Sequence, residues 1–220
     1  MASGLLNTLA LTTYGDSIPQ DGRLVIRPGD KVLMLGDSIT VVATWYWWEH
    51  LRLAVDAFYA ARGLTAQTWV DSGTSGNTTA DLLAGVEARV INHNPNVVII
   101  HIGINDDFIG LTQQESIDNY NDLLDAIVLA LPNVRIMMLS PAFDTKRPTA
   151  DEEITARRTA FAAIAYARGY PYVDLRAYYE AMSSTDQTAL SSDGGLHPSD
   201  PIGRAWWSNN ALHQINMRTE

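Results

Sequence analysis

The sequence predicts an α/β fold, in which a parallel sheet of five strands is covered by helices on both of its faces. Short apolar runs rich in branched and aromatic residues recur along the chain, as expected for buried strands. Helical patterns separate these runs, and the links between them are short. Such alternation of strand and helix is typical of a three-layer α/β/α sandwich.

The five predicted strands are short, and several of them run into glycine or polar residues. The first covers 31–35, follows the turn signal Pro28-Gly29-Asp30 and ends at Gly36. The other four cover 68–70, 97–102, 134–139 and 172–175. Because parallel sheets bind ligands beyond the carboxyl ends of their strands, the loops after the strands are where functional residues are expected.

Four helices are predicted between the strands, over 44–62, 79–92, 113–131 and 152–168, and a fifth over 201–216. Gly63 and Gly169 stand where a left-handed residue ends a helix. Pro95 and Pro132 follow the other two helices, and proline cannot continue a helix. Each helix that lies between strands therefore has a recognisable stop.

The predicted helix over 113–131 has the clearest pattern of its own. Thr112 and Glu115 form a capping box ahead of it. Its apolar residues recur at spacings of three and four, so they lie on one face that must pack against the sheet. These residues are Ile117, Tyr120, Leu124, Ile127 and Leu131.

A chain of 220 residues fits one domain, predicted to comprise an N-terminal extension over 1–22 and a core over 23–216. The apolar fraction of 46% is enough for a buried core. The chain has no cysteine, which excludes disulfides, thiolate zinc sites and cysteine nucleophiles. The polar stretch 183–192 is too short for a linker between domains and is predicted to be a surface loop.

Charge and hydropathy exclude two classes of partner. The formal net charge of −10 opposes binding to nucleic acid, which depends on clustered Lys and Arg. No apolar run reaches the roughly 18 to 20 residues that cross a bilayer. The N-terminus lacks the pattern of a signal peptide, but such a segment is removed on secretion, so the compartment stays open between cytoplasmic and secreted.

Polar, glycine-containing segments follow three of the predicted strands, and a fourth precedes the last helix. They are Gly36-Asp37-Ser38-Ile39-Thr40, Asp71-Ser72-Gly73-Thr74-Ser75-Gly76-Asn77, Gly103-Ile104-Asn105-Asp106 and Asp193-Gly194-Gly195-Leu196-His197-Pro198. In this order they resemble the four blocks of the SGNH hydrolases, a family within the GDSL esterases and lipases. The resemblance runs from residue 31 to the last helix.

The resemblance implies a flavodoxin-like fold and a serine esterase that needs no metal or other cofactor. It assigns Ser38 as the nucleophile and His197 as the general base. It further implies an oxyanion hole made by the backbone N–H groups of Ser38 and Gly76 and by the side-chain amide of Asn105. Glycine at position 76 permits close backbone approach and unusual dihedral angles.

The chemistry accounts for these residue types. A serine hydroxyl is a poor nucleophile until a neighbouring base removes its proton, which an imidazole does well near neutral pH. Negative charge then develops on the carbonyl oxygen of the ester, and fixed N–H donors stabilise it.

The acidic member of the triad departs from the family pattern. The family usually has its aspartate three residues before the histidine, where this chain has Gly194, and the nearest acid is Asp193. A one-residue bulge at Gly194 and Gly195 would still bring Asp193 to His197. Asp200 is a poorer candidate because it leads into the last helix, and a Ser-His dyad without an acid is the alternative.

Each residue also has a purely structural interpretation. Ser38 could cap a helix after its strand, and Asn105 and Gly76 could serve turns only. Asp37 and Asp106 are interpreted as structural, bonding loop N–H groups near the site. His101 lies in the middle of a predicted strand and is interpreted as a core or interface histidine whose ring nitrogens are satisfied by hydrogen bonds.

Tryptophan is unusually frequent, with the run Trp45-Tyr46-Trp47-Trp48 near the start and Trp206-Trp207 near the end. A helix cannot bury four consecutive aromatic residues on one face, since neighbours lie about 100° apart. We therefore expect core packing plus a subunit interface, which would make a homo-oligomer. The alternative is a wall that contacts a sugar or an acyl group.

The predicted function is hydrolysis of short-acyl esters through an acyl-enzyme, with a carbohydrate acetyl ester as the first substrate. Within the same fold, a short-chain lipid or aryl esterase or a thioesterase is the alternative. A metal-dependent phosphohydrolase is the rival mechanism if Asp37, Asp106 and Asp193 share one crevice. A third interpretation is a non-catalytic carbohydrate-binding module in which the shifted Asp193 leaves the triad broken.

Overall fold

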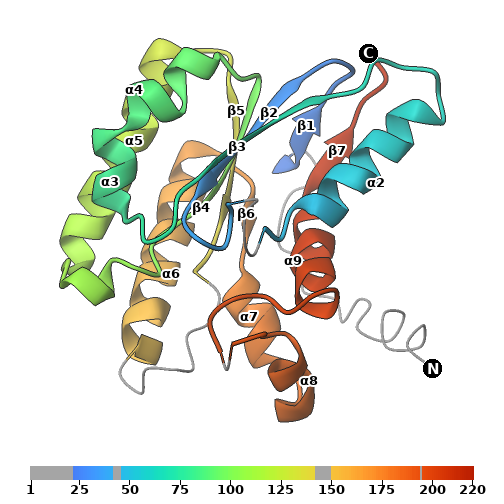
Figure 1. The fold of residues 1–220 in the computed structure, drawn as a ribbon. Helices are drawn as coiled ribbons and strands as arrows, with labels where there is room; N and C mark the ends of the chain where they lie inside the picture. Colours follow the sequence, from blue (N-terminus) through green and yellow to red (C-terminus); the bar gives the residue numbers. More distant parts are fainter. Residues whose placement is uncertain (1–21, 42–45, 142–149, 194) are drawn as a thin grey trace.

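A five-stranded parallel sheet forms the centre of the molecule (Figure 1). The computed structural model describes residues 22–41, 46–141, 150–193 and 195–220. The strands lie in the order β3-β2-β4-β5-β6, with bounds Thr68–Gly73, Lys31–Gly36, Val97–His101, Arg135–Leu139 and Tyr172–Val173. In chain order of the five this is 2-1-3-4-5, the flavodoxin-like order, so the predicted fold class is confirmed.

Helices cover both faces of this sheet. On one side pack α2 (Glu49–Ala60) and α9 (Ile202–Leu212), and on the other α3 (Thr79–Ala84), α5 (Gln113–Ala130) and α6 (Ala150–Arg168) (Figure 1). Alternate strand residues supply the two cores: Val97 and Ile99 join the first, and Val98 and Ile100 join the second. Strands buried on both faces explain why their sequences are continuous apolar runs rather than alternating ones.

Several predicted helix ends are confirmed. Thr112 and Glu115 form the capping box of α5, with side chain and backbone bonded in both directions. Gly63 and Gly169 adopt the left-handed conformation, with φ of 64° and 71°. The predicted helix over 79–92 is wrong as one element, because it breaks at Gly85 into α3, α4 (Val86–Arg89) and the 3-10 turn η3 (Ile91–His93). Glycine is a weak helix former, and here it caps the first piece.

The region after β6 holds more helix than predicted. The fifth predicted strand, observed as β6, stops at Val173 because the side chain of Asp174 caps α7 (Leu175–Glu180) by accepting the N–H of Ala177. The stretch 183–192, expected as a loop, contains α8 (Ser184–Ala189), which Ser183 caps in the same way. Both helices are too short for periodicity to reveal them, and only their capping residues give a signal.

A second, two-stranded sheet was not predicted. Strand β1 (Leu24–Ile26) pairs in parallel with β7 (Ile215–Met217), so the prediction of helix through 216 is wrong. The guanidinium of Arg135 braces β1 by donating to the carbonyl of Val25 at 2.6 Å and to Asp30 at 2.7 Å. The pairing of β7 with a strand nearly 200 residues away decides its conformation, which no local pattern encodes.

The described tryptophans of the two aromatic runs are buried within the single chain. Helix α2 begins only at Glu49, so Trp47 and Trp48 precede it and the helical spacing does not apply to them. Trp47, Trp48, Trp206 and Trp207 are each at most 8% exposed. Trp45 and Thr44 lie outside the described residues, as do 1–21 of the predicted extension. The homo-oligomer stays a prediction, and it would need a surface other than these four side chains.

Candidate active site

The first candidate residue, Ser38, lies in a tight turn directly after β2. The backbone N–H groups of Thr40 and Val41 donate to the carbonyl of Asp37 at 3.1 and 3.2 Å. Strand β2 lies between β3 and β4, at the point where the strand order of the sheet reverses. Ligands of open α/β sheets bind in the crevice at such a point. Among the described residues no helix begins at Ser38, so the helix-capping interpretation does not apply.

Ser38 and His197 meet although 159 positions separate them in the sequence. Ser38 Oγ lies 2.9 Å from His197 Nε2. On the other side of the ring, His197 Nδ1 lies 2.7 Å from Asp193 Oδ2. A carboxylate at this distance keeps the proton on Nδ1, which leaves the Nε2 lone pair directed at the serine hydroxyl. The three side chains thus form a continuous hydrogen-bonded chain from carboxylate to hydroxyl.

The loop between residues 191 and 198 lets Asp193 reach His197 despite the four-residue spacing. Ser191 and Pro198 form an antiparallel bridge, and the N–H of Ser192 donates to the carbonyl of His197 at 3.0 Å. Within this closed loop Asp193 Oδ1 accepts the N–H groups of Leu196 and His197 at 3.1 and 3.0 Å. The other oxygen, Oδ2, is therefore the one that faces the imidazole. Gly194, the first glycine of the expected bulge, lies outside the described residues.

Contacts of the neighbouring helices hold the same loop in place. After the His-Pro step, Ser199 donates its N–H to Leu190 at 2.7 Å and its hydroxyl to Ala189 at 2.5 Å, at the end of α8. A side chain at Gly203, in the first turn of α9, would overlap the carbonyl oxygen of Leu190. The sequence reasoning did not single out Gly203, and a glycine inside a predicted helix was the available signal.

The two remaining candidates lie in the loops after β3 and β4. Asn105 is half-buried and donates one amide N–H to the carbonyl of Asn77 at 2.9 Å, so its second N–H is left for another acceptor. Gly76 precedes Asn77 and has a φ of 81°. The glycine is needed for that backbone conformation, and a side chain there would meet no atom of the described chain within 4 Å.

A close backbone approach within the chain occurs at Gly73. A Cβ atom at Gly73 would lie 2.5 Å from the backbone nitrogen of Val41 and 2.8 Å from its Cα. The end of β3 therefore packs backbone to backbone against the turn that carries Ser38. Gly73 stands in the same polar block as Gly76, but the sequence alone did not distinguish their roles.

The aspartates beside the candidate residues are buried, and their carboxylates accept hydrogen bonds that hold the loops in place. Asp106 accepts the N–H and the hydroxyl of Thr79 at 2.9 and 2.8 Å, which ties the loop after β4 to the start of α3. Asp37 accepts the N–H of Ile39 at 2.9 Å. Among the described residues no three His, Cys, Asp or Glu side chains gather as a metal site would require. Asp37, Asp106 and Asp193 therefore do not gather into the carboxylate group on which the phosphohydrolase rival depended.

A buried tyrosine lies near Asp106. Burial raises the pKa of Tyr120 far above its usual value, and the negative charge of Asp106 raises it further. Tyr120 is fully buried, so its phenol stays neutral and acts as part of the core under α5.

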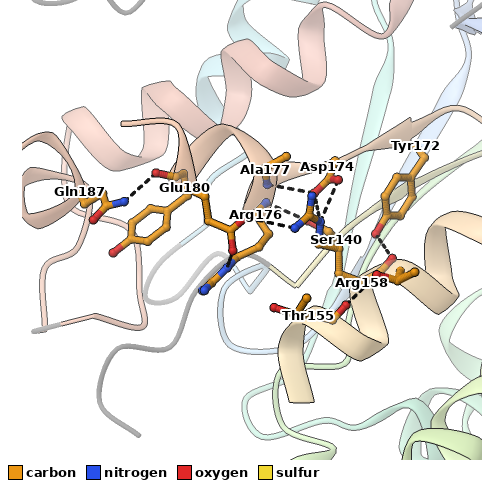
Figure 2. A network of polar contacts seen from close by, with 11 residues as sticks. Ser140, Thr155, Arg158, Tyr172, Asp174, Arg176, Ala177, Glu180 and Gln187 are labelled. Carbon is orange, nitrogen blue, oxygen red and sulfur yellow. Dashed lines mark hydrogen bonds and ion pairs between the residues drawn. The ribbon is translucent and has the colours of Figure 1, made fainter. Parts of the chain in front are cut away.

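A polar network at the ends of β5 and β6 supports α7, which leads toward the Asp193 loop (Figure 2). Arg158 of α6 lies 2.7 Å from Asp174 and 3.2 Å from Glu180. Glu180 also accepts from Arg176 at 2.7 Å, and Ser140 accepts the backbone N–H of Arg176. Figure 2 shows Asp174 at the centre, between α6 and the start of α7.

Replacing Asp174 by alanine is expected to lower the free energy of unfolding by about 2 kcal/mol. Roughly half of this comes from the lost cap of α7. About 1 kcal/mol more comes from the lost ion pair with Arg158, a modest amount because both side chains are partly exposed. Urea unfolding followed by circular dichroism measures the change.

Ser183→Ala is the matched control for this prediction. Ser183 caps α8 through the same kind of bond but contacts no arginine in the described part of the chain. It is expected to lose about 1 kcal/mol or less. Equal losses in the two variants would show that the ion pair of Asp174 contributes nothing.

The described helices include none that is both long and apolar enough to span a bilayer.

Three exposed side chains lie at the same edge of the sheet as the candidate residues. They are Thr74 and Ser75, beside Gly76, and Phe108, three residues after Asn105. Both hydroxyl-bearing and apolar groups are therefore present next to the two candidate oxyanion loops.

Known proteins resemble this chain in sequence pattern and in fold. The model of the GDSL-like Lipase/Acylhydrolase family matches residues 34–204. A structure from Parabacteroides merdae, described as a GDSL-like lipase, aligns with a TM-score of 0.75 at 20% identity, over 87% of this chain and 98% of that one. The lipase/acylhydrolase from Enterococcus faecalis aligns with a TM-score of 0.70 at 21% identity, over 84% of this chain and 94% of that one.

A third similar structure is a catalytic mutant of Axe2, an acetylxylan esterase from Geobacillus stearothermophilus. It aligns with a TM-score of 0.67 at 23% identity, over 89% of this chain and 99% of that one. Among curated proteins none matches. At these identities the structures establish the fold, while the family model, which covers more than half of the chain, establishes the family. The chain therefore belongs to the GDSL-like Lipase/Acylhydrolase family and is a carboxylic ester hydrolase.

Proposed function

We propose that the protein is a serine esterase that removes short acyl groups, acetyl first, from carbohydrate esters through an acyl-enzyme. The observation that carries the mechanism is the chain of contacts from Asp193 through His197 to Ser38, at 2.7 and 2.9 Å. Both distances are those of ordinary hydrogen bonds, so these three side chains already make the contacts that proton transfer needs.

In the first half-reaction Ser38 Oγ bonds to the ester carbonyl carbon while His197 Nε2 takes the hydroxyl proton. Asp193 stabilises the imidazolium that forms. The tetrahedral intermediate then collapses, the bond to the alcohol oxygen breaks, and His197 returns the proton to that oxygen. The acyl group stays on Ser38 and the alcohol leaves.

In the second half-reaction water attacks the acyl-serine and passes a proton to His197. The bond to Ser38 Oγ breaks, the serine recovers its proton, and the free acid leaves. In both halves the negative carbonyl oxygen is stabilised by the backbone N–H groups of Ser38 and Gly76 and by Asn105. The bond from Asn105 to Asn77 supports this role, because it fixes the amide before substrate binds.

The carbohydrate acetyl ester is supported by likeness and by the surroundings of the site. Axe2, whose fold this chain shares, is named an acetylxylan esterase. The hydroxyl of Thr74, which accepts from Arg89 at 2.7 Å and can still donate its own proton, and the exposed ring of Phe108 would suit an alcohol with hydroxyl groups and an apolar face, as a sugar has. The third interpretation, a binding module with a broken triad, loses its basis because Asp193 contacts His197.

An ester panel tests the proposal. Purified protein is expected to hydrolyse p-nitrophenyl acetate with a kcat/KM at least about tenfold above that for the octanoate, because each poorly placed methylene costs roughly tenfold or more. It is also expected to release acetate from acetylated xylooligosaccharides. A preference for octanoate would favour the lipid esterase, and hydrolysis of p-nitrophenyl acetate without release from any acetylated sugar would contradict the carbohydrate substrate.

A further inference from the structure

Two ionisable side chains, Asp37 and His101, are fully buried next to Ser38 and take no direct part in the proposed chemistry. The side chains of both are 0% exposed, and His101 Nδ1 lies 3.8 Å from Asp37 Oδ1. Among the described residues, the two ring nitrogens of His101 have no hydrogen-bond partner. Asp37 Oδ2 has none there either. Buried polar groups are bonded in the large majority of cases, so this pair needs an explanation.

Asp37 holds the turn that carries the nucleophile. Its Oδ1 accepts the N–H of Ile39, and its backbone carbonyl accepts the N–H groups of Thr40 and Val41. These bonds enclose Ser38 between the acceptor and the donors. A shift of the Asp37 carboxylate would therefore move the backbone on the far side of Ser38.

Close packing of the backbone also restricts the turn that carries Ser38. A side chain at Gly36 would overlap the carbonyl oxygen of His101 and the hydroxyl of Thr40. Gly36 and His101 are also partners in the register of β2 and β4. The residue before Asp37 is thus in backbone contact with His101, while the carboxylate of Asp37 faces the imidazole.

The ring of His101 also contacts the helix that follows His197. Its centroid lies 4.8 Å from that of Trp207 in α9, with the planes at 75°. Ser208, the next residue of α9, donates to the carbonyl of Trp47. One buried imidazole therefore lies between the turn that carries Ser38 and the helix whose N-terminal loop carries His197.

A buried carboxylate is costly unless it is paired. In the described part of the chain, His101 is the single basic group within 4 Å of Asp37. The distance of 3.8 Å is longer than a hydrogen bond, so the bond would form only when the contact shortens, as hydrogen bonds of catalytic sites often do on binding substrate.

We propose that His101 is a positioning residue of the reaction: it donates Nδ1–H to the carboxylate of Asp37 and so fixes the turn that presents Ser38 to His197. The proposal rests on the proposed function, since it assigns a second histidine, which is buried, to the same reaction. His101 acts through Asp37 and contacts neither substrate nor the reacting atoms.

Three variants test this proposal, with kcat expressed per site titrated by a fluorophosphonate. His101→Leu is expected to lower kcat by about 10- to 100-fold, the size of effect that a misplaced reacting group produces, with KM little changed. His101→Asn is expected to recover most of the loss, because its Nδ2 takes the place of Nδ1 and still donates. Asp37→Asn keeps an oxygen for Ile39 but loses the carboxylate, and it is expected to match His101→Leu.

The double variant Asp37→Asn/His101→Leu should be no slower than the slower single variant, because the two residues act as one unit. Ile99→Ala is the control: it lies on the same strand and face, faces the same core, and is expected to unfold at a lower urea concentration while keeping kcat per titrated site. This separates positioning from general loss of fold.

Wild-type kcat per titrated site in His101→Leu, equal losses in His101→Leu and His101→Asn, or additive losses in the double variant would each overturn the proposal. If His101→Leu does not fold, Asp37→Asn decides alone, and an undiminished kcat there overturns it. Activity that survives in Ser38→Ala would instead refute the proposed function, so the two failures are distinguishable.

Discussion

Replacing Ser38 by alanine is expected to lower kcat for p-nitrophenyl acetate by about 10⁴-fold or more, the loss seen when a hydrolase nucleophile of this kind is removed. The hydroxyl oxygen is the atom that forms the covalent bond to the acyl group, and nothing else in the contact chain can replace it. His197 Nε2, which lies 2.9 Å from Ser38 Oγ, would then have no proton to accept. Fluorophosphonate labelling should disappear with the activity.

Ser75→Ala is the matched control. Ser75 is also exposed at the carboxyl edge of the sheet, one residue before Gly76, and it is expected to keep both labelling and turnover. Thermal unfolding of both variants should stay within a few degrees of the wild type, since each loses one partly or fully exposed hydroxyl. Full activity in Ser38→Ala would rule out the acyl-enzyme, whatever the other residues do.

The sequence was sufficient for the fold because its strongest patterns are local. The five apolar runs of the central sheet and the face of α5 are each visible within a window of a few turns or one strand. The flavodoxin-like class of the sheet followed from the family resemblance, and its parallel strands from the alternation of elements. What failed was local structure decided by distant partners, as in β7, which is a strand because β1 lies beside it.

In the candidate site too, local sequence patterns were predicted correctly, whereas contacts with distant residues were not predicted. The four polar blocks identified Ser38, His197, Gly76 and Asn105, and their loops meet at one edge of the sheet because parallel strands end there. Sequence spacing left two features open. It did not show that Gly73, and not Gly76, makes the close backbone approach to the turn of Ser38.

The second open feature was the reach of Asp193. A four-residue spacing to His197 works only because the bridge between Ser191 and Pro198 closes the loop and two backbone N–H groups hold one carboxylate oxygen. Neither contact follows from the identities of the residues alone. The burial of Trp47 and Trp48 was expected, but the start of the helix near them was predicted too early, since α2 begins only at Glu49.

Asp193→Asn is expected to lower kcat by about 10⁴-fold, as the equivalent change does in a serine protease triad. The structure gives a specific reason. Oδ1 of Asp193 already accepts the N–H groups of Leu196 and His197, so the amide oxygen of an asparagine must take that position. Its NH₂ group then faces Nδ1 of His197.

A donor in that position forces the imidazole proton onto Nε2, and the ring can then no longer accept the proton of Ser38. The backbone bonds of the loop survive the change, so stability should fall little while kcat falls severely. Asp200→Asn is the control, because Asp200 is exposed and contacts Arg204 at 3.5 Å, and its kcat should stay within about twofold of the wild type. A loss of less than about tenfold in Asp193→Asn would mean that Ser38 and His197 work as a dyad, since a wrongly protonated ring could not sustain such a rate.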